Sequence, residues 1–321
     1  MRPSSPSVNI FDPTNQNPRP DNGVGGFIQM QAFSKINLYL EVLEKRSDGY
    51  HNLSTVMQSL GLHDIITIRN DGNVALQLTC DHPDLPVDKR NLVYRAADYM
   101  MKRYAIHQNI SIHIEKRVPV SAGLGGGSSD CAATLVGMNQ LFMLGLELDE
   151  LCDIGLTFGA DVPFCIKGGT QYAEGVGERL IELPPHPDCW IVLATVPVAV
   201  STAEVFGRVR LDGGEPIHKL REAHEKRIQT MKSAVCAGNV TQITGAFFNR
   251  LTGITAAMHP EVNDLITKIK TLGAVNAAMS GSGPTVFGYF TNEETAWHAQ
   301  AELKKTIQSV YITQPERMRM I

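Results

Sequence analysis

The chain has 321 residues, 43% of them hydrophobic, so it is long enough for two domains and can bury a sizeable core. Its formal net charge is −4, whereas nucleic-acid-binding proteins typically carry an excess of basic residues. No apolar run is long enough to span a bilayer. Its 6 cysteines are scattered without C-x-x-C or zinc-site spacing. We therefore expect reduced thiols in a cytoplasmic protein that binds neither nucleic acid nor membrane.

The N-terminal segment has the composition of a tail. It carries Pro3, Pro6, Pro13, Pro18 and Pro20 among Asn, Ser and Gly. It has neither the apolar centre of a signal peptide nor the Arg-rich amphipathic pattern of a transit peptide. We expect residues 1–27 to form a disordered tail, with the folded part of the chain beginning near Phe27.

The first predicted element is a strand over residues 34–42. Apolar and polar side chains alternate there, and the polar face carries Lys35, Asn37, Tyr39 and Glu41. Alternation of this kind is typical of a half-buried strand, and it places Lys35 and Asn37 on the same face. The triplet Ser47–Gly49 that follows is a turn signal.

Further elements follow from periodicity and from the positions of Gly and Pro. We predict strands over residues 65–68, 74–78, 110–114, 190–198 and 285–290, and helices over residues 91–104, 219–231, 262–272 and 293–307. Cys131, Leu135, Met138 and Phe142 recur at intervals of four, three and four, which predicts an amphipathic helix with one buried stripe.

Mixed strands and helices without regular βαβ alternation indicate an α+β fold. The proline-rich segment over residues 183–187 suggests a domain boundary near residue 186. We therefore expect one domain over residues 28–186 and a second over residues 187–321.

A glycine-rich stretch from Pro119 to Asp130 lies between a predicted strand and a predicted helix. Its glycines at 123, 125, 126 and 127 let backbone N–H groups turn toward an anion, and Ser128, Ser129 or Asp130 can cap the helix. The stretch lacks the Lys of a Walker A loop, and Ser128 replaces the last glycine of a dinucleotide fingerprint. The glycines alone leave a phosphate cradle and a flexible loop equally open. The strand–loop–helix context favours the cradle.

Three segments in the same order resemble the motifs of the GHMP kinases: residues 32–38, 119–130 and 276–287. The resemblance implies the two-domain fold of that family, with an N-terminal ribosomal-protein-S5-like domain and a C-terminal ferredoxin-like α/β-plait domain. It also implies that ATP donates a phosphoryl group to an alcohol. The residues that it assigns to ATP are Asn91, Lys116, Pro119, Val120, Ser121, Ala122, Gly123, Leu124, Gly125, Gly126, Gly127, Ser128 and Ser129.

Residues 46–53, 156–164 and 174–178 are similar to those of family members that phosphorylate the 2-hydroxyl of a methylerythritol unit carrying cytidine diphosphate. This resemblance implies a small-molecule substrate bearing cytidine diphosphate and a role in the non-mevalonate route to isoprenoids. It assigns the cytosine contacts to Tyr50 and His51, with Phe206 as the opposing ring of an aromatic sandwich around the base. The other residues that it assigns to the substrate are Asn37, Thr202, Gly281, Ser282 and Gly283.

By the same resemblance, Asp161 is the general base and Lys35 neutralises charge between the hydroxyl and the γ-phosphate. Residue type alone leaves open that Asp161 caps a helix and that Lys35 lies on a solvated strand face. Phosphoryl transfer normally involves Mg²⁺, and no second acid has the position of a metal ligand. We therefore expect MgATP, with the metal held mainly by phosphates and no protein ligand assigned.

Alternatives remain for the function. Another GHMP kinase substrate, such as homoserine or a mevalonate-type alcohol, offers no base for Tyr50 and His51 to contact. A non-catalytic GHMP-like nucleotide sensor would not need both Lys35 and Asp161. A plain α+β binding module leaves the three ordered motifs unexplained. For assembly, we expect a monomer or a weak homodimer.

Overall fold

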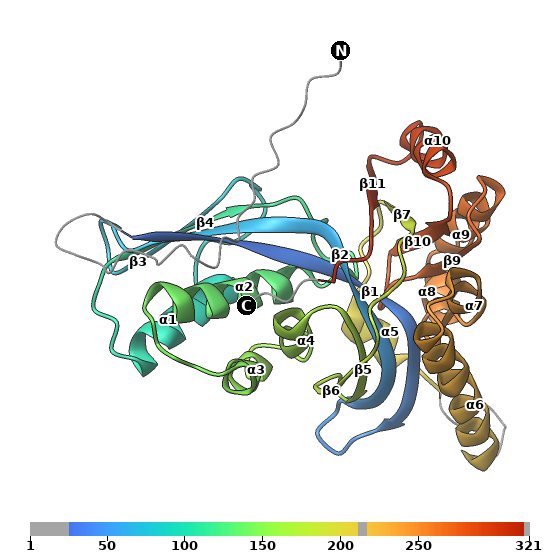
Figure 1. The fold of residues 1–321 in the computed structure, drawn as a ribbon, viewed down its shortest axis with the longest axis horizontal. Helices are drawn as coiled ribbons and strands as arrows, with labels where there is room; N and C mark the ends of the chain where they lie inside the picture. The colour runs from blue at the N-terminus through green and yellow to red at the C-terminus, as the bar shows by residue number, and fades with distance from the viewer. Residues whose placement is uncertain (1–25, 211–216, 318–321) are drawn as a thin grey trace.

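The computed structural model describes residues 26–210 and 217–317, so the tail expected over residues 1–27 lies almost entirely outside the described residues. Within them the strands form a 7-stranded sheet and a 4-stranded sheet. Figure 1 shows the larger sheet with its helices on the left and the smaller sheet with its helices on the right. Strands and helices are mixed without regular alternation, which confirms the α+β prediction.

The larger sheet is built on one long hairpin. Strands β1 (Phe27–Lys45) and β2 (His51–Arg69) pair antiparallel along their whole length, and the predicted turn at residues 47–49 joins them. Strand β2 also pairs with β4 (Ile110–Glu115) near its end and with β5 (Thr170–Gly175) near its start. The remaining strands of this sheet are β3 (Leu76–Cys80), β6 (Arg179–Glu182) and β8 (Phe248–Asn249).

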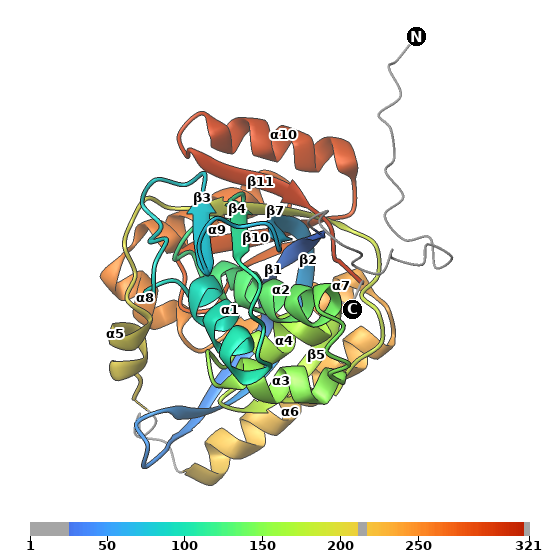
Figure 2. The same cartoon turned by 90° about the vertical axis from the view of Figure 1, so that its left-hand side faces the viewer.

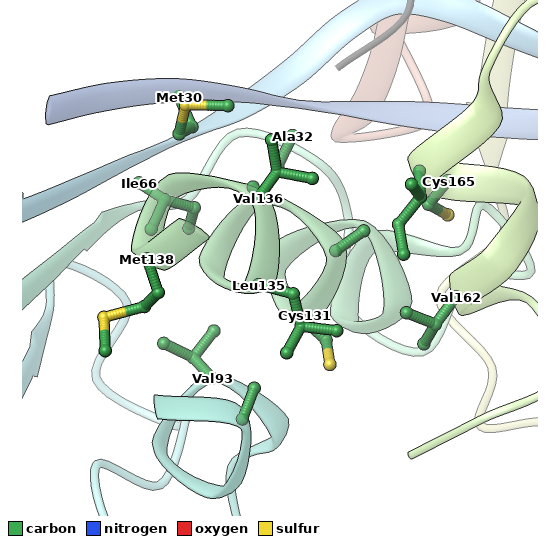
Figure 3. Close-up of a cluster of buried hydrophobic side chains, with 14 of the residues drawn as sticks. Met30, Ala32, Ile66, Val93, Cys131, Leu135, Val136, Met138, Val162 and Cys165 are labelled. Atoms are coloured by element: carbon green, nitrogen blue, oxygen red, sulfur yellow. The ribbon is translucent and has the colours of Figure 1, made fainter. Parts of the chain in front are cut away.

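Helix α2 (Gly126–Leu141) is the centre of the layer on one face of this sheet, as Figure 2 shows. The layer also holds α1 (Leu92–Arg103), α3 (Leu148–Leu156) and α4 (Val162–Lys167). Figure 3 shows side chains of α2 between Met30 of β1, Val93 of α1 and Val162 of α4. Because α2 has neighbours on every side, it is buried throughout residues 129–138, and the prediction of an amphipathic helix is wrong.

The smaller sheet has the strand order β11-β7-β10-β9. Its strands are β7 (Trp190–Thr195), β9 (Asn276–Met279), β10 (Thr285–Phe290) and β11 (Ser309–Thr313). The helices after β7 are α5 (Thr202–Gly207), α6 (Ile217–Cys236), α7 (Val240–Gly245), α8 (Thr252–Met258), α9 (Glu261–Thr271) and α10 (Glu293–Lys304). The strands and helices predicted in this half of the chain are confirmed, with differences of a few residues at their ends.

The strand predicted over residues 34–42 lies inside β1, but it is buried on both faces. A register shift between Asn37 and Tyr39 reverses the alternation there. Tyr39 therefore packs in the same hydrophobic cluster as Ile36, and its hydroxyl lies 2.9 Å from Nδ1 of His224 on α6. The half-buried prediction is wrong because elements distant in sequence, α6 among them, cover the second face.

The domain boundary expected near residue 186 falls between β6 and β7, the first strand of the smaller sheet. The chain beyond it still contributes to the larger sheet, since β8 pairs with β1 and Pro315 forms a bridge with Leu60. The division into domains over residues 28–186 and 187–321 stays a prediction. No helix in residues 26–210 or 217–317 is both long and apolar enough to cross a membrane.

Candidate active site

The glycine-rich stretch is a loop that leads from β4 into α2. The helix begins at Gly126, and Gly125 before it has a φ of 71°, in the left-handed region that favours glycine. No side chain of the described residues caps this end, which leaves the first backbone N–H groups of α2 open to an anion. The predicted cap at Ser128, Ser129 or Asp130 is wrong, because the helix starts earlier and takes these residues into its first turns.

A second glycine loop lies directly against the first. A Cβ at Gly123, whose φ is +78°, would lie 2.5 Å from the carbonyl oxygen of Ser280. The hydroxyl of Ser280 donates to the carbonyl oxygen of Gly123 over 2.9 Å. Residues 281–283, which are predicted to contact the substrate, therefore adjoin the glycine-rich loop. The Ser282 hydroxyl lies 2.8 Å from the hydroxyl of Thr202 on α5.

Lys35 lies beside the loop and is only 4% exposed. Its backbone N–H donates to the carbonyl oxygen of Leu124 over 2.9 Å, and a Cβ at Gly125 would lie 2.9 Å from its Cγ. Its ammonium group donates to Oδ1 of Asn37 over 2.8 Å and pairs with Oδ2 of Asp161 at 3.4 Å. An amine, an amide and a carboxylate thus meet at the glycine loop, from segments far apart in the sequence.

The Asp161 carboxylate has no structural partner other than Lys35 among the contacts of the described residues. It precedes α4 but makes no capping hydrogen bond, so the alternative that Asp161 serves as a cap lacks support. Its side chain is 38% exposed, which leaves the carboxylate accessible to a substrate.

The Asn37 amide is fixed in orientation. Its Nδ2 donates to the hydroxyl of Thr55 over 2.9 Å, and that hydroxyl donates to the carbonyl oxygen of Tyr39 over 2.6 Å. With its N–H group held in this way, Asn37 presents its oxygen to Lys35. The amide therefore directs the lysine ammonium group toward the site.

Two of the three residues predicted to contact cytosine are brought together. The rings of His51 and Phe206 have centroids 5.5 Å apart and an interplanar angle of 34°. Two aromatic rings in direct contact have centroids about 4.5–7 Å apart. The rings of His51 and Phe206 therefore contact each other directly and leave no space for a base between them. Tyr50 is 64% exposed at the turn, where its backbone N–H donates to Asp48. Burial, and secondarily Lys45, lowers the pKa of His51.

Asn91 and Lys116, both predicted to contact ATP, have side chains engaged within the protein. Asn91 caps α1, since its Oδ1 accepts from the N–H of Val93 over 2.9 Å and its Nδ2 donates to the carbonyl oxygen of Pro86 over 2.8 Å. The Lys116 ammonium group lies between two buried carboxylates, those of Asp64 and Asp130. Asp64 is not recognisable from the sequence, because a single acid before an apolar run carries no signal. Contacts of Asn91 and Lys116 with ATP stay predictions.

A cleft of about 460 Å³ borders the phosphate loop. One wall is formed by residues 116–121 and includes four of the predicted ATP contacts, Lys116, Pro119, Val120 and Ser121. The opposite wall comes from residues 195–199, Ser309 and Tyr311 near the smaller sheet. A space of this size is typical of a small-molecule site.

Two family models match separate parts of the chain. Residues 91–169 match the family described as GHMP kinases N terminal domain, and residues 220–308 match the family described as GHMP kinases C terminal. The chain is 43% identical over 282 residues to the 4-diphosphocytidyl-2-C-methyl-D-erythritol kinase of Enterococcus faecalis, covering 88% of this chain and 96% of that one. It is 42% identical over 291 residues to the kinase of that name from Acetivibrio thermocellus, covering 89% and 98%.

Solved structures show the same fold. A 4-(cytidine 5'-diphospho)-2C-methyl-D-erythritol kinase matches with a TM-score of 0.73 and 29% identity, over 90% of this chain and 100% of that one. A homoserine kinase from Cytophaga hutchinsonii matches with a TM-score of 0.72 over 92% of this chain and 96% of its own. Its identity is only 18%, so it shows the shared fold alone.

Two alanine substitutions separate the structural use of glycine in the loop from its use in binding. Gly123→Ala should lower the free energy of unfolding by at least about 1 kcal/mol, because of the positive φ and the Ser280 carbonyl. Gly127 is helical and a Cβ there meets no atom within 4 Å, so Gly127→Ala should raise that free energy by up to about 1 kcal/mol. If a phosphate occupies this space, Gly127→Ala still weakens ATP binding about tenfold or more.

Denaturant titration and calorimetric ATP titration measure the two effects. Normal ATP binding by the Gly127→Ala protein would show that no phosphate of ATP occupies the space beside Gly127.

Proposed function

The chain belongs to the GHMP kinase family, and we propose that it transfers the γ-phosphoryl group of ATP to the 2-hydroxyl of 4-diphosphocytidyl-2-C-methyl-D-erythritol. This reaction belongs to the non-mevalonate pathway of isoprenoid biosynthesis. One observation carries the proposal: Lys35 contacts both Asn37 and Asp161 beside the glycine loop, in a chain whose relatives are kinases named for this substrate.

In the proposed reaction, the triphosphate lies at the N-terminus of α2, where open N–H groups and the helix dipole favour an anion. The 2-hydroxyl oxygen attacks the γ-phosphorus while Asp161 accepts its proton. A new O–P bond forms, the bond from the γ-phosphorus to the bridging oxygen breaks, and ADP leaves with the electron pair. Lys35 neutralises the charge that develops between donor and acceptor. Asp161 then releases its proton to solvent.

We propose that the donor is MgATP, with the metal ion held mainly by phosphate oxygens. The loop suits such a complex, because the space beside Gly127 admits a phosphate group and backbone N–H groups occupy only part of its oxygens. When bound, Mg²⁺ supplies charge neutralisation on the β- and γ-phosphates. No side chain is assigned as its ligand.

We place the cytidine at the hairpin end of the site, against Tyr50, His51 and Phe206. The ring contact between His51 and Phe206 supports this placement, since it joins the hairpin to α5. The lowered pKa of His51 favours a neutral ring, which can both donate and accept hydrogen bonds at a base edge. The paired hydroxyls of Thr202 and Ser282 would contact the diphosphate or the methylerythritol unit.

The alternatives have weaker support. Homoserine and mevalonate kinases share the fold at 18% and 15% identity, which says nothing about substrate. A non-catalytic nucleotide sensor would have no use for an accessible Asp161 paired with a buried Lys35. We also propose a cytoplasmic protein that binds no nucleic acid and is a monomer or a weak homodimer.

The substrate assignment predicts that the purified protein forms ADP from ATP only when the cytidylylated methylerythritol is present. Homoserine and mevalonate, at the same concentration in a coupled ADP assay, are the matched controls. An equal rate with either control would overturn the assignment. ATP binding without turnover of any of the three alcohols would favour a sensor.

The proposed base predicts that Asp161→Asn lowers kcat by at least about 100-fold, because an amide of the same size cannot accept the proton. The matched control is Asp149→Asn on α3, since Asp149 is an exposed acid that pairs only with Lys167 at 3.1 Å. Steady-state kinetics with saturating ATP measure both variants. A near-normal kcat for Asp161→Asn would show that Asp161 does not act as the base.

The proposed cytosine platform predicts that Phe206→Ala raises KM for the cytidylylated alcohol about tenfold and leaves KM for ATP within about twofold. Trp297→Ala is the control, because Trp297 is 51% exposed on α10. The two KM values separate a local loss from general destabilisation. The stacking proposal fails if Phe206→Ala and Tyr50→Ala both keep the wild-type KM for the alcohol.

A further inference from the structure

A buried cluster of three ionisable side chains lies beneath the glycine-rich loop. The ammonium group of Lys116 contacts Oδ2 of Asp64 at 2.5 Å and Oδ2 of Asp130 at 2.7 Å. Lys116 and Asp130 have side chains that are 4% and 5% exposed, and that of Asp64 is 0% exposed. Asp64 comes from β2, Lys116 from the segment after β4, and Asp130 from α2. The cluster therefore joins three elements that meet at the loop.

The second oxygen of Asp64 fixes the start of the loop. It accepts hydrogen bonds from the backbone N–H groups of Arg117 and Val118, at 2.5 and 2.8 Å. The other end of the loop is fixed through Asp130 in the first turns of α2. A Cβ at Gly126 would lie only 3.1 Å from the Lys116 ammonium group, so that group lies directly under the first residue of the helix.

The charges of the cluster nearly cancel. Burial raises the pKa of Asp130 to about 8, because the opposing effect of Lys116 is partly offset by Asp64. Burial acts to lower the pKa of Lys116, but Asp130 and Asp64 outweigh it and raise that pKa. Burial therefore favours the protonated form of Asp130, while Lys116 stays charged.

Titratable groups that face the cluster include Asp81, whose Oδ1 accepts a hydrogen bond from the backbone N–H of Lys116 over 2.8 Å, and three thiols. The thiols are Cys80 of β3, Cys131 of α2 and Cys165 of α4, and each has a raised pKa through burial. These thiols stay neutral near neutral pH. The free oxygen of Asp130, Oδ1, is buried without a hydrogen-bond partner among the described residues.

We propose that Asp64, Lys116 and Asp130 form a positioning cluster that holds both ends of the phosphate loop in the geometry that binds ATP. None of the three needs to touch the nucleotide. Their effect is to fix where the N–H groups of the loop and of the α2 N-terminus point. The inference rests on the proposed function only in that the loop binds ATP.

The competing interpretation is that the Lys116 side chain contacts ATP itself. The structure opposes it, because two carboxylates occupy the ammonium group and the side chain is 4% exposed. The two interpretations differ in what removal of Asp64 does. If Lys116 acts by positioning the loop, removal of the Asp64 charge should weaken ATP binding as much as removal of Lys116 does. If Lys116 is a direct contact, removal of Asp64 frees it.

The test is calorimetric ATP binding by the full chain in the Lys116→Met and Asp64→Asn variants. Asparagine keeps an acceptor for the two backbone N–H groups but loses the charge that holds Lys116. We expect both variants to weaken ATP binding about tenfold, with KM for the alcohol changed less than about threefold. Asp98→Asn is the control, since Asp98 forms an exposed pair with Lys102 at 2.7 Å on α1.

Normal binding by Asp64→Asn would overturn the inference, whether or not Lys116→Met binds. If Lys116→Met does not fold, the Asp64→Asn result decides alone. Because the alcohol is absent from this titration, an error in the substrate assignment leaves the test intact.

A pH profile provides a readout that a merely structural role would not affect. In the wild type, KM for ATP should rise at least about threefold between about pH 7 and about pH 9.5, as Asp130 ionises and adds a buried negative charge near the triphosphate. Asp130→Asn should abolish this rise. If KM for ATP still rises with pH in the Asp130→Asn variant, ionisation of Asp130 is not the cause of the rise.

The raised pKa of Asp130 also makes the free energy of unfolding depend on pH. The pKa of Asp130 in the folded protein, about 8, lies above its ordinary value of 3.8. The folded chain therefore holds a proton that the unfolded chain releases, and the free energy of unfolding falls as the pH rises from 4 toward 8. Asp130→Asn should flatten this fall.

Discussion

Close backbone contact at glycines is the constraint on which the rest of the site depends. The phosphate loop touches the second glycine loop at Gly123 and the Lys35 side chain at Gly125, and at both places a Cβ would come within 2.9 Å of another atom. Only chains without side chains at these points can approach so closely. This approach lets Lys35 and Asn37 of β1 meet Asp161, which precedes α4, beside the loop. The chemistry follows from the backbone packing.

The parts of the structure that the sequence could predict are those set by neighbouring residues. The spacing of glycines over residues 123–127 specifies a tight loop before a helix whatever surrounds it, and the loop is where it was predicted. Lys35 and Asn37 are two residues apart, so any strand places them on one face. The three motifs also implied which distant segments converge. The contact between Ser280 and Gly123 agrees with that implication.

The parts that could not be predicted depend on packing between distant elements. The shift between Asn37 and Tyr39 follows from pairing with β2 and from the cover that α6 provides, and neither is visible in residues 34–42. Helix α2 was expected to have a solvent face, but five elements surround it and bury residues 129–138, namely β1, β2, α1, α3 and α4. Asp64 gave no sign of its role, because a partner 52 residues away determines it.

Buried ion pairs on both sides of β1 explain how so glycine-rich a site keeps its shape. On the face opposite the loop, Glu41 is 2% exposed and pairs with Arg250 at 2.6 Å and Arg227 at 3.3 Å. Such pairs add little net stability, because desolvation costs about as much as the attraction returns. Apolar side chains can shift slightly against each other at little cost, whereas hydrogen-bonded charged groups favour one geometry. The position of Lys35 itself is fixed by its contacts with the carbonyl oxygen of Leu124, with Asn37 and with Asp161.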